Sequence, residues 1–117
     1  MMDESADPRL IALMLTGDQK AFATLIERYQ FMAQRLAVQL TGNQEVAREL
    51  VQEAIVQAYL SLDRLRDTTR FKSWFYGIVL NVCRGYLRTQ KLRAVSLEAL
   101  IEGQAIEELN FPDAEVD

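Results

Sequence analysis

Residues 18–42 read DQKAFATLIERYQFMAQRLAVQLTG, and this stretch indicates the fold class most clearly. Its apolar residues recur at steps of three and four, which is the spacing of one face of an α-helix. Asp18 is a favoured N-cap residue, and Gly42 stands where a glycine is expected after a helix C-terminus. The pattern therefore predicts a long helix over about residues 19–41. Its apolar face consists of Phe22, Leu25, Ile26, Tyr29, Met32, Ala33, Leu36 and Leu40.

The rest of the chain also favours helices. The expected helices cover about residues 8–15, 19–41, 44–62 and 70–90, with a polar connection over 63–69. Asn43 can cap the third helix, and Asp67 or Thr69 can cap the fourth. Only five Gly and two Pro occur among 117 residues, so few turns are needed, and no pair of strands can be recognised. We expect an all-α fold, a compact bundle of about four helices.

The length and the last segment of the chain predict its organisation. A chain of 117 residues suits one domain. We expect residues 1–93 to form this helical domain and residues 94–117 to form an acidic linker or tail that is partly disordered. Within the tail, Ser96 can cap a short helical turn that ends near Leu100 or Ile101.

The composition argues against several classes of protein. There is no His and only one Cys, so the usual zinc ligand sets and an intrachain disulfide are both unavailable. The N-terminus is acidic and lacks the apolar core of a signal peptide, and no apolar run is long enough to span a membrane. We therefore expect a cytoplasmic protein that uses no metal, no cofactor and no membrane.

Charge is sorted along the chain into blocks of opposite sign. Residues 63–93 carry eight Lys or Arg against two Asp, a net charge of +6. Residues 1–62 carry five basic and eight acidic residues, and residues 94–117 carry seven acidic residues and no basic one. Aromatic residues accompany the basic segment, namely Phe71, Trp74, Phe75, Tyr76 and Tyr86. Because cations attract phosphate and aromatic rings stack on unpaired bases, this segment is the predicted nucleic-acid-binding region.

The predicted fourth helix has two distinct faces. The expected core face consists of Phe71, Phe75, Ile78, Val79, Val82 and Tyr86. A second face consists of Arg70, Trp74, Gly77, Asn81, Arg84, Arg88 and Lys91. Its cations can neutralise phosphates, Asn81 can hydrogen-bond a base edge, and Trp74 can stack on a base. The alternative is a solvated face with Trp74 completing the core, but such faces usually mix charges, and no acid occurs from Phe71 to Arg93.

The third helix presents a different polar surface. Its outer side carries Glu45, Glu49, Gln52 and Glu53. This side is either an ordinary solvated face or a protein-docking face whose acids meet a basic partner. Opposed charges of that kind aid orientation and encounter rate more than affinity. Periodicity alone does not choose between the two interpretations.

Three segments in register resemble a known family. Residues 17–29 (GDQKAFATLIERY) resemble the opening of bacterial sigma factors of the extracytoplasmic-function group. Residues 47–53 (ARELVQE) and 71–82 (FKSWFYGIVLNV) resemble two further motifs of the same group, in the same order and with the same gaps. The resemblance covers about residues 7–100. It implies the helical domain that carries conserved region 2 of these factors.

The resemblance implies a role in transcription initiation without catalysis. One helix would dock on the β′ clamp helices of core RNA polymerase, and the next helix with its preceding loop would recognise and melt the minus-ten promoter element by its non-template strand. The implied docking residues are Glu49, Gln52, Glu53, Ile55 and Tyr59. The implied DNA-binding residues are Arg64, Arg66, Arg70, Phe71, Lys72, Trp74, Asn81, Arg84, Arg88 and Lys91. Within this set, the loop from Arg64 to Arg70 would receive a flipped base, and Phe71 and Trp74 would support or stack on the melted strand.

The sequence departs from the family pattern at some positions. Glu49 stands where the family usually has Asp, Arg48 replaces a commonly acidic residue, and Tyr59 replaces a frequent Trp. Family members also carry a second helical domain with a helix-turn-helix, so we expect this sequence to be one domain of a longer protein; otherwise the protein lacks upstream promoter recognition. The main alternative function is a helical module that binds a protein, such as an anti-sigma regulator, and no DNA. An enzyme is disfavoured, because there is no His and no glycine-rich phosphate loop.

Overall fold

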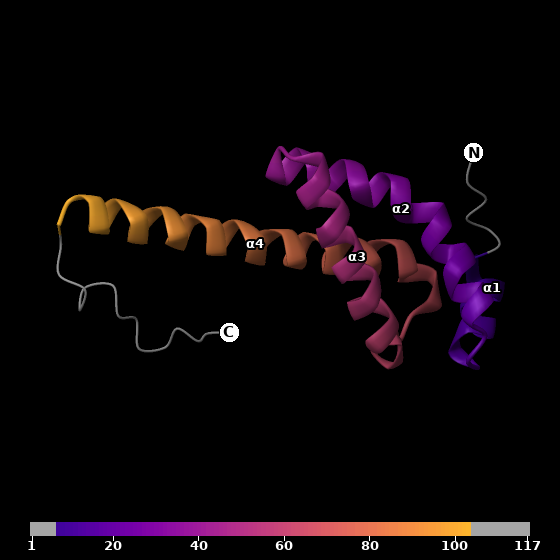
Figure 1. Cartoon of the computed structure of the whole chain (residues 1–117). Helices are drawn as coiled ribbons and strands as arrows, with labels where there is room; N and C mark the ends of the chain where they lie inside the picture. The colour runs from indigo at the N-terminus through magenta and orange to yellow at the C-terminus, as the bar shows by residue number, and fades with distance from the viewer. Residues whose placement is uncertain (1–6, 104–117) are drawn as a thin grey trace. The chain divides into compact units, whose positions relative to one another are not determined.

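The computed structural model describes residues 7–103, apart from the side chains of Asp7 and Thr68. The helices are α1 (Asp7–Leu15), α2 (Gln19–Thr41), α3 (Gln44–Leu60) and α4 (Phe71–Ile101), shown in Figure 1. Two short 3-10 turns, η2 (Leu62–Arg64) and η3 (Thr68–Arg70), lie between α3 and α4. No strand occurs within residues 7–103. The predicted all-α fold with four helices is therefore confirmed.

Local capping sets the limits of α2 as the sequence predicts. The Asp18 side chain accepts hydrogen bonds from the backbone N–H groups of Lys20 and Ala21, at 3.0 and 3.2 Å. At the other end, Gly42 adopts a left-handed conformation with φ of 72°, and its N–H donates to the Val38 carbonyl at 2.7 Å. A left-handed residue costs little only when it is glycine. These two residues therefore define the length of α2.

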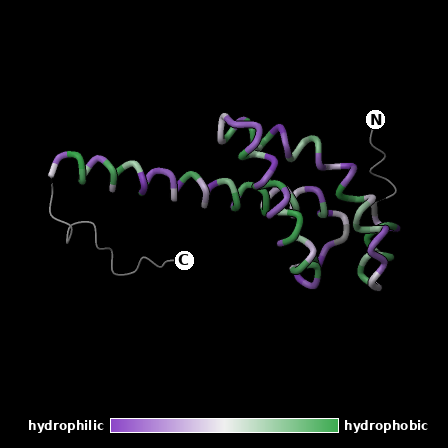
Figure 2. Tube along the Cα trace, viewed as in Figure 1, coloured by the Kyte–Doolittle hydropathy of each residue, from purple (hydrophilic) through white to green (hydrophobic). Residues whose placement is uncertain are grey.

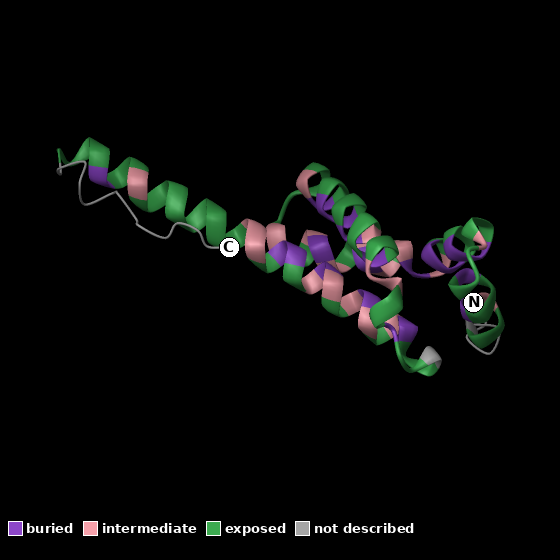
Figure 3. Cartoon of the chain, turned by 90° about the horizontal axis from the view of Figure 1, so that it is seen from below, coloured by how far each residue is buried: buried purple, intermediate pink, exposed green. Residues whose placement is uncertain are grey.

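The helices α1, α2 and α3 pack together with the first turns of α4. Figures 2 and 3 show apolar and buried residues recurring at each turn of these helices. Aromatic rings connect α2 to α4, because the centroid of Tyr29 lies 6.0 Å from that of Phe71, which in turn lies 6.1 Å from that of Phe75. The largest fully buried side chains are Tyr29, Phe71, Phe75, Ile11, Leu25, Val51, Val79 and Cys83. Each large apolar side chain buried in this way contributes about 1.5–3 kcal/mol of transfer free energy.

Most of the predicted core residues are buried, with some differences at the edges of each face. Phe22, Leu25, Ile26, Tyr29 and Ala33 of α2 are buried. The outer members of the predicted faces are only half-buried, namely Met32, Leu36 and Leu40 on α2 and Ile78 and Tyr86 on α4. Two small residues outside the predicted core faces, Ala37 on α2 and Cys83 on α4, are fully buried. Burial raises the pKa of the Cys83 thiol.

The helix α4 extends to Ile101, whereas the sequence predicted that it would end near residue 90. Residues 94–101 (AVSLEALI) contain good helix formers and no Gly or Pro. Gly103, with φ of 75°, follows the last helical turn. The chain divides within α4 into two compact units, one ending at Arg84 and the other beginning at Gly85. Most of the predicted acidic tail, residues 104–117, lies outside the described residues.

The second unit contains the later turns of α4 as its described part. Many of its apolar residues are exposed, namely Leu87, Leu92, Val95, Leu97, Leu100 and Ile101. No helix among residues 7–103 combines the length and the apolar character that crossing a membrane requires.

Candidate nucleic-acid interface

The connection between α3 and α4 presents cations around one buried anchor. Leu65 lies between the turns η2 and η3 and is only 7% exposed. Its neighbours Arg64 and Arg66 are both exposed, as is Arg70 at the end of η3. Because the anchor fixes the middle of the connection, its arginines are presented from a defined backbone. This arrangement fits the predicted base-receiving loop from Arg64 to Arg70.

A hollow of about 360 Å³ lies between this connection and the first turn of α4. Its lining residues are Arg64, Leu65, Arg66, Asp67, Arg70, Ser73 and Trp74. Three of them are guanidinium side chains and one is the indole of the only Trp in the chain. A hollow with cations and one aromatic wall can hold a planar, uncharged ring while the cations engage neighbouring phosphates.

Asp67 is the one carboxylate in the wall of this hollow. Its Oδ1 accepts a hydrogen bond from the Thr69 hydroxyl at 2.6 Å and from the Thr69 backbone N–H at 3.0 Å. These two bonds lower the pKa of the Asp67 carboxyl, and the bond from the hydroxyl has the larger effect. The positive charge of Arg70 lowers this pKa further. Asp67 is therefore ionised at neutral pH. The predicted capping by Asp67 is confirmed for the turn η3, which leads directly into α4.

Packing inside the bundle supports Trp74. The Trp74 ring lies 5.8 Å from the Phe71 ring, centroid to centroid, at an interplanar angle of 46°. Phe71 is only 1% exposed, so its ring is covered by the bundle, whereas Trp74 is half-buried and lines the hollow. Of the two roles expected for Phe71, support of Trp74 is compatible with this burial, and stacking on a base is not.

The helix α4 continues the cationic surface away from the hollow. Gly77, Asn81 and Arg84 are all exposed, at the three- and four-residue steps that keep side chains on one helix face. A Cβ atom added to Gly77 would meet no atom within 4 Å, so this part of the helix surface is open. Lys72 is half-buried and makes contacts within the protein. The later cations, Arg88 and Lys91, belong to the second unit and are also exposed.

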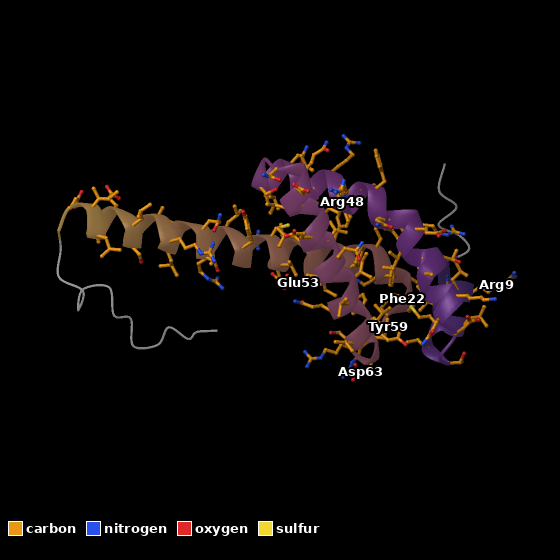
Figure 4. The ribbon with its side chains drawn as sticks, viewed as in Figure 1. Arg9, Phe22, Arg48, Glu53, Tyr59 and Asp63 are labelled. Atoms are coloured by element: carbon orange, nitrogen blue, oxygen red, sulfur yellow. The ribbon has the colours of Figure 1, made fainter. Side chains whose placement is uncertain are left out.

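The helix α3 carries the predicted docking residues. Glu49, Gln52 and Glu53 are exposed, and the Gln57 amide donates to the Glu53 carboxylate at 3.5 Å. Figure 4 shows Glu53 and Tyr59 on α3, with Tyr59 next to Phe22 of α2. The Tyr59 and Phe22 rings meet edge-on with centroids 5.2 Å apart, so Tyr59 is held in place while 42% of it stays exposed.

The helix α3 also exposes apolar residues that are not among the predicted docking residues. Val56 is 56% exposed and Leu60 is 73% exposed, and with Gln52 they follow one another at four-residue steps. Ile55, which the resemblance implied, is half-buried instead. The sequence carries a signal for this surface, because Val56 and Leu60 are apolar and follow the polar outer residue Gln52 at four-residue steps. Exposed aliphatic residues beside acids are typical of a surface that another protein covers.

A second hollow lies beside Tyr59, near the C-terminal end of α3. It has a volume of about 350 Å³ and is lined by Met14, Leu15, Gly17, Asp18, Gln19, Phe22, Tyr59, Leu62 and Asp63. The Gln19 amide donates to the Tyr59 hydroxyl at 3.3 Å across its edge. The surface around Tyr59 is therefore made by α1, α2 and α3 together, and not by α3 alone.

Comparison with known proteins identifies the family of this chain. The family model described as sigma-70 region 2 matches residues 25–93, which include α3 and the hollow with its arginines. The chain is 32% identical to the ECF RNA polymerase sigma-E factors of Escherichia coli strain K12 and of Salmonella typhimurium strain LT2, over 97% of this chain and 62% of each relative. It is 30% identical to the protein of the same name from Haemophilus influenzae, over 87% of this chain and 53% of that protein.

The chain thus spans 62% of the length of the first of these relatives. The matched segment begins within α2 and ends within α4, so it contains α3, the connection that follows it and the first turns of α4. The resemblance of three sequence motifs, the all-α architecture and the matched family model agree, and this chain belongs to the sigma-70 region 2 family.

Proposed function

We propose that this chain docks on core RNA polymerase and recognises and melts the minus-ten element of promoters. One observation carries the proposal: a hollow walled by three arginines and Trp74 adjoins an exposed helix face that has no acid. Membership of the sigma-70 region 2 family supports the same assignment. The chain would act in the cytoplasm, where polymerase and promoter DNA are found.

The DNA-binding surface can supply the free energy that strand separation needs. Extruding one base from a duplex costs a few kcal/mol in lost pairing and stacking. Stacking of that base on an aromatic side chain returns about 1–3 kcal/mol, and Trp74 is already oriented for it by Phe71. Contacts from Arg84 and the loop arginines to phosphates add a favourable binding free energy, which decreases as the salt concentration rises. Melting of this kind needs no covalent step and no nucleotide hydrolysis by the chain.

The docking surface would hold the chain on polymerase while DNA is bound. Its partner would be the β′ clamp helices, with basic residues opposite Glu49 and Glu53 and apolar residues opposite Val56 and Leu60. The docking residues lie on α3 and the DNA-binding residues lie on the following connection and α4, so the two partners would contact different elements of the chain. An anti-sigma protein that covered Val56 and Leu60 would compete with polymerase.

The test is the salt dependence of DNA binding by the polymerase complex. Arg84→Ala should lower the affinity for single-stranded non-template DNA and reduce the slope of log affinity against log salt by about 0.7, the value for one phosphate contact on a single strand. Arg9→Ala is the matched control, because Arg9 is exposed on α1, outside the proposed DNA-binding surface. Equal affinities and slopes for wild type and Arg84→Ala would contradict the proposal.

A further inference from the structure

The later turns of α4 carry a face that matches a segment of the same chain in charge and in apolar character. We infer that the acidic segment, residues 104–117, folds back on the face of α4 that carries Arg88 and Lys91 and competes with nucleic acid for these two cations. The competition rests on the proposed function, because it assumes that Arg88 and Lys91 contact DNA. The contact between the segment and α4 does not depend on that assumption.

This face of α4 begins with two cations that have no counter-charge beside them. Arg88 and Lys91 are exposed, and within residues 7–103 neither side chain forms a hydrogen bond or an ion pair. The next acid along the helix is Glu98, about 10 Å beyond Lys91 at the rise of an α-helix. Exposed cations in this position attract any acid that can reach them.

Apolar residues continue the same face towards the end of α4. Leu92 and Val95 are 49% and 47% exposed, and they follow Arg88 at steps of four and three residues. No aromatic residue occurs from Leu87 to Gly103, so this stretch offers no ring for stacking on a base. DNA would contact the cations and leave Leu92 and Val95 in water, whereas a peptide with both acids and apolar residues can cover the whole face.

The acidic segment has the composition that this face requires. Residues 104–117 carry five acids and no basic residue, and apolar side chains accompany the acids. The acids are Glu107, Glu108, Asp113, Glu115 and Asp117, and the larger apolar residues are Ile106, Leu109, Phe111 and Val116. Charge complementarity and apolar contact therefore favour the same pairing.

The end of α4 allows the chain to turn back. The Gly103 N–H donates to the Leu100 carbonyl at 3.1 Å, and Gly103 has φ of 75°, a conformation in which helices commonly end and the chain changes direction. Arg88 precedes Gly103 by about 22 Å along the helix. About seven extended residues span this distance at roughly 3.3 Å each. The acids of the segment can therefore reach both cations.

Disulfide trapping tests the contact in the full chain. Val95→Cys with Leu109→Cys places one thiol on the face of Arg88 and the other in the acidic segment. In the matched control, Leu97→Cys replaces Val95→Cys, because a step of two residues turns the thiol by about 200° around the helix. Leu97 is exposed and lies nearer to Leu109 in the sequence, so the control is not disadvantaged.

The expected result is a difference in trapping rate between the two pairs. The native Cys83 is buried and is kept in both proteins. Under the same mild oxidation, the pair with Val95→Cys should form its intramolecular disulfide about tenfold faster, because the contact raises the effective concentration of one thiol near the other. Equal rates for the two pairs would overturn the inference.

DNA binding by the free chain tests the competition. Glu107→Gln with Glu108→Gln should raise the affinity for a single-stranded oligonucleotide about two- to tenfold at low salt, as expected when two exposed ion pairs no longer compete. Glu27→Gln with Glu45→Gln is the matched control, because it changes the net charge equally at exposed residues of α2 and α3. An equal gain in the control would show that only net charge matters, and the competition would be wrong.

The two measurements separate this inference from the proposed function. If the chain binds no DNA, with or without polymerase, the proposed function and the competition both fail, and the trapping rates still decide whether the segment contacts α4. If trapping favours Val95→Cys but Glu107→Gln with Glu108→Gln leaves DNA affinity unchanged, the segment covers α4 without shielding its cations. That result would overturn the competition and leave the proposed function standing.

Discussion

Replacing Gly77 with Ala should change stability and DNA binding in opposite directions. Gly77 is exposed in the interior of α4, its φ is not positive, and an added Cβ would meet no atom within 4 Å. The methyl group therefore fits the free protein without strain. Glycine in the interior of a helix costs about 0.5–1 kcal/mol relative to alanine, so Gly77→Ala should stabilise the fold by that amount. The melting temperature should rise by a few degrees, as about 4–8 °C per kcal/mol applies to domains of about this size.

The same methyl group should weaken DNA binding. Gly77 lies between Trp74 and Asn81 on the proposed DNA-binding surface, where a glycine lets a sugar-phosphate backbone approach the helix closely. We expect Gly77→Ala to bind single-stranded non-template DNA several-fold more weakly in complex with polymerase, although the free protein is more stable. Thermal unfolding followed by circular dichroism and a fluorescence binding assay measure the two effects on the same preparation.

Thr24→Ala provides the control for Gly77→Ala. Thr24 is exposed on α2, and its substitution by Ala raises helix propensity without touching the DNA-binding surface. It should increase stability and leave DNA affinity unchanged. If Gly77→Ala also leaves DNA affinity unchanged, DNA does not approach α4 at this residue, and the assignment of this face is wrong.

Three further predictions concern docking, capping and pH. Leu60→Glu should abolish capture of the chain by core polymerase in a pull-down without lowering its melting temperature, because Leu60 is 73% exposed; retained capture would show that polymerase does not cover this end of α3. Asp18→Ala should lower the free energy of unfolding by about 1 kcal/mol, since it leaves the N–H groups of Lys20 and Ala21 without their acceptor; denaturant titration would reveal an unchanged midpoint if the cap were unimportant. The lowered pKa of Asp67 means that its ionised form stabilises the fold above the pKa of the unfolded state, and this stabilisation is lost as pH falls through the folded pKa. Wild type should therefore lose stability relative to Asp67→Asn below roughly pH 4, the usual range of an Asp carboxyl, and parallel pH profiles for the two proteins would exclude this linkage.

Features that depend on nearby residues could be predicted from the sequence. The limits of α2 follow from Asp18 and Gly42, and the structure has the helix over Gln19–Thr41 as expected. The end of α4 was placed too early, because residues 94–101 contain no stop signal and their acidic surroundings suggested a linker. The acidic composition predicted that the linker begins at residue 94, but residues 94–101 have a high helix propensity and belong to α4.

Features made by packing between distant residues could not be predicted in the same way. Periodicity places Phe71 and Trp74 on neighbouring parts of one helix, but it does not show that Tyr29 helps bury the first while the second lines a hollow. The hollow depends on Leu65, an apolar residue in a polar connection that turns into the core. Tyr59 is likewise held by a distant residue, because its ring contacts Phe22 of α2 while 42% of Tyr59 stays exposed.

The direct test of the account is the affinity of core polymerase for single-stranded minus-ten DNA, measured without the chain, with wild type and with Trp74→Ala. We expect tight binding only when the wild-type chain is present. Loss of the stacking surface in Trp74→Ala should cost about 1–3 kcal/mol, a decrease of roughly 5- to 150-fold. An affinity that is the same with and without the chain, or the same for wild type and Trp74→Ala, would contradict the claim that this surface holds the separated strand.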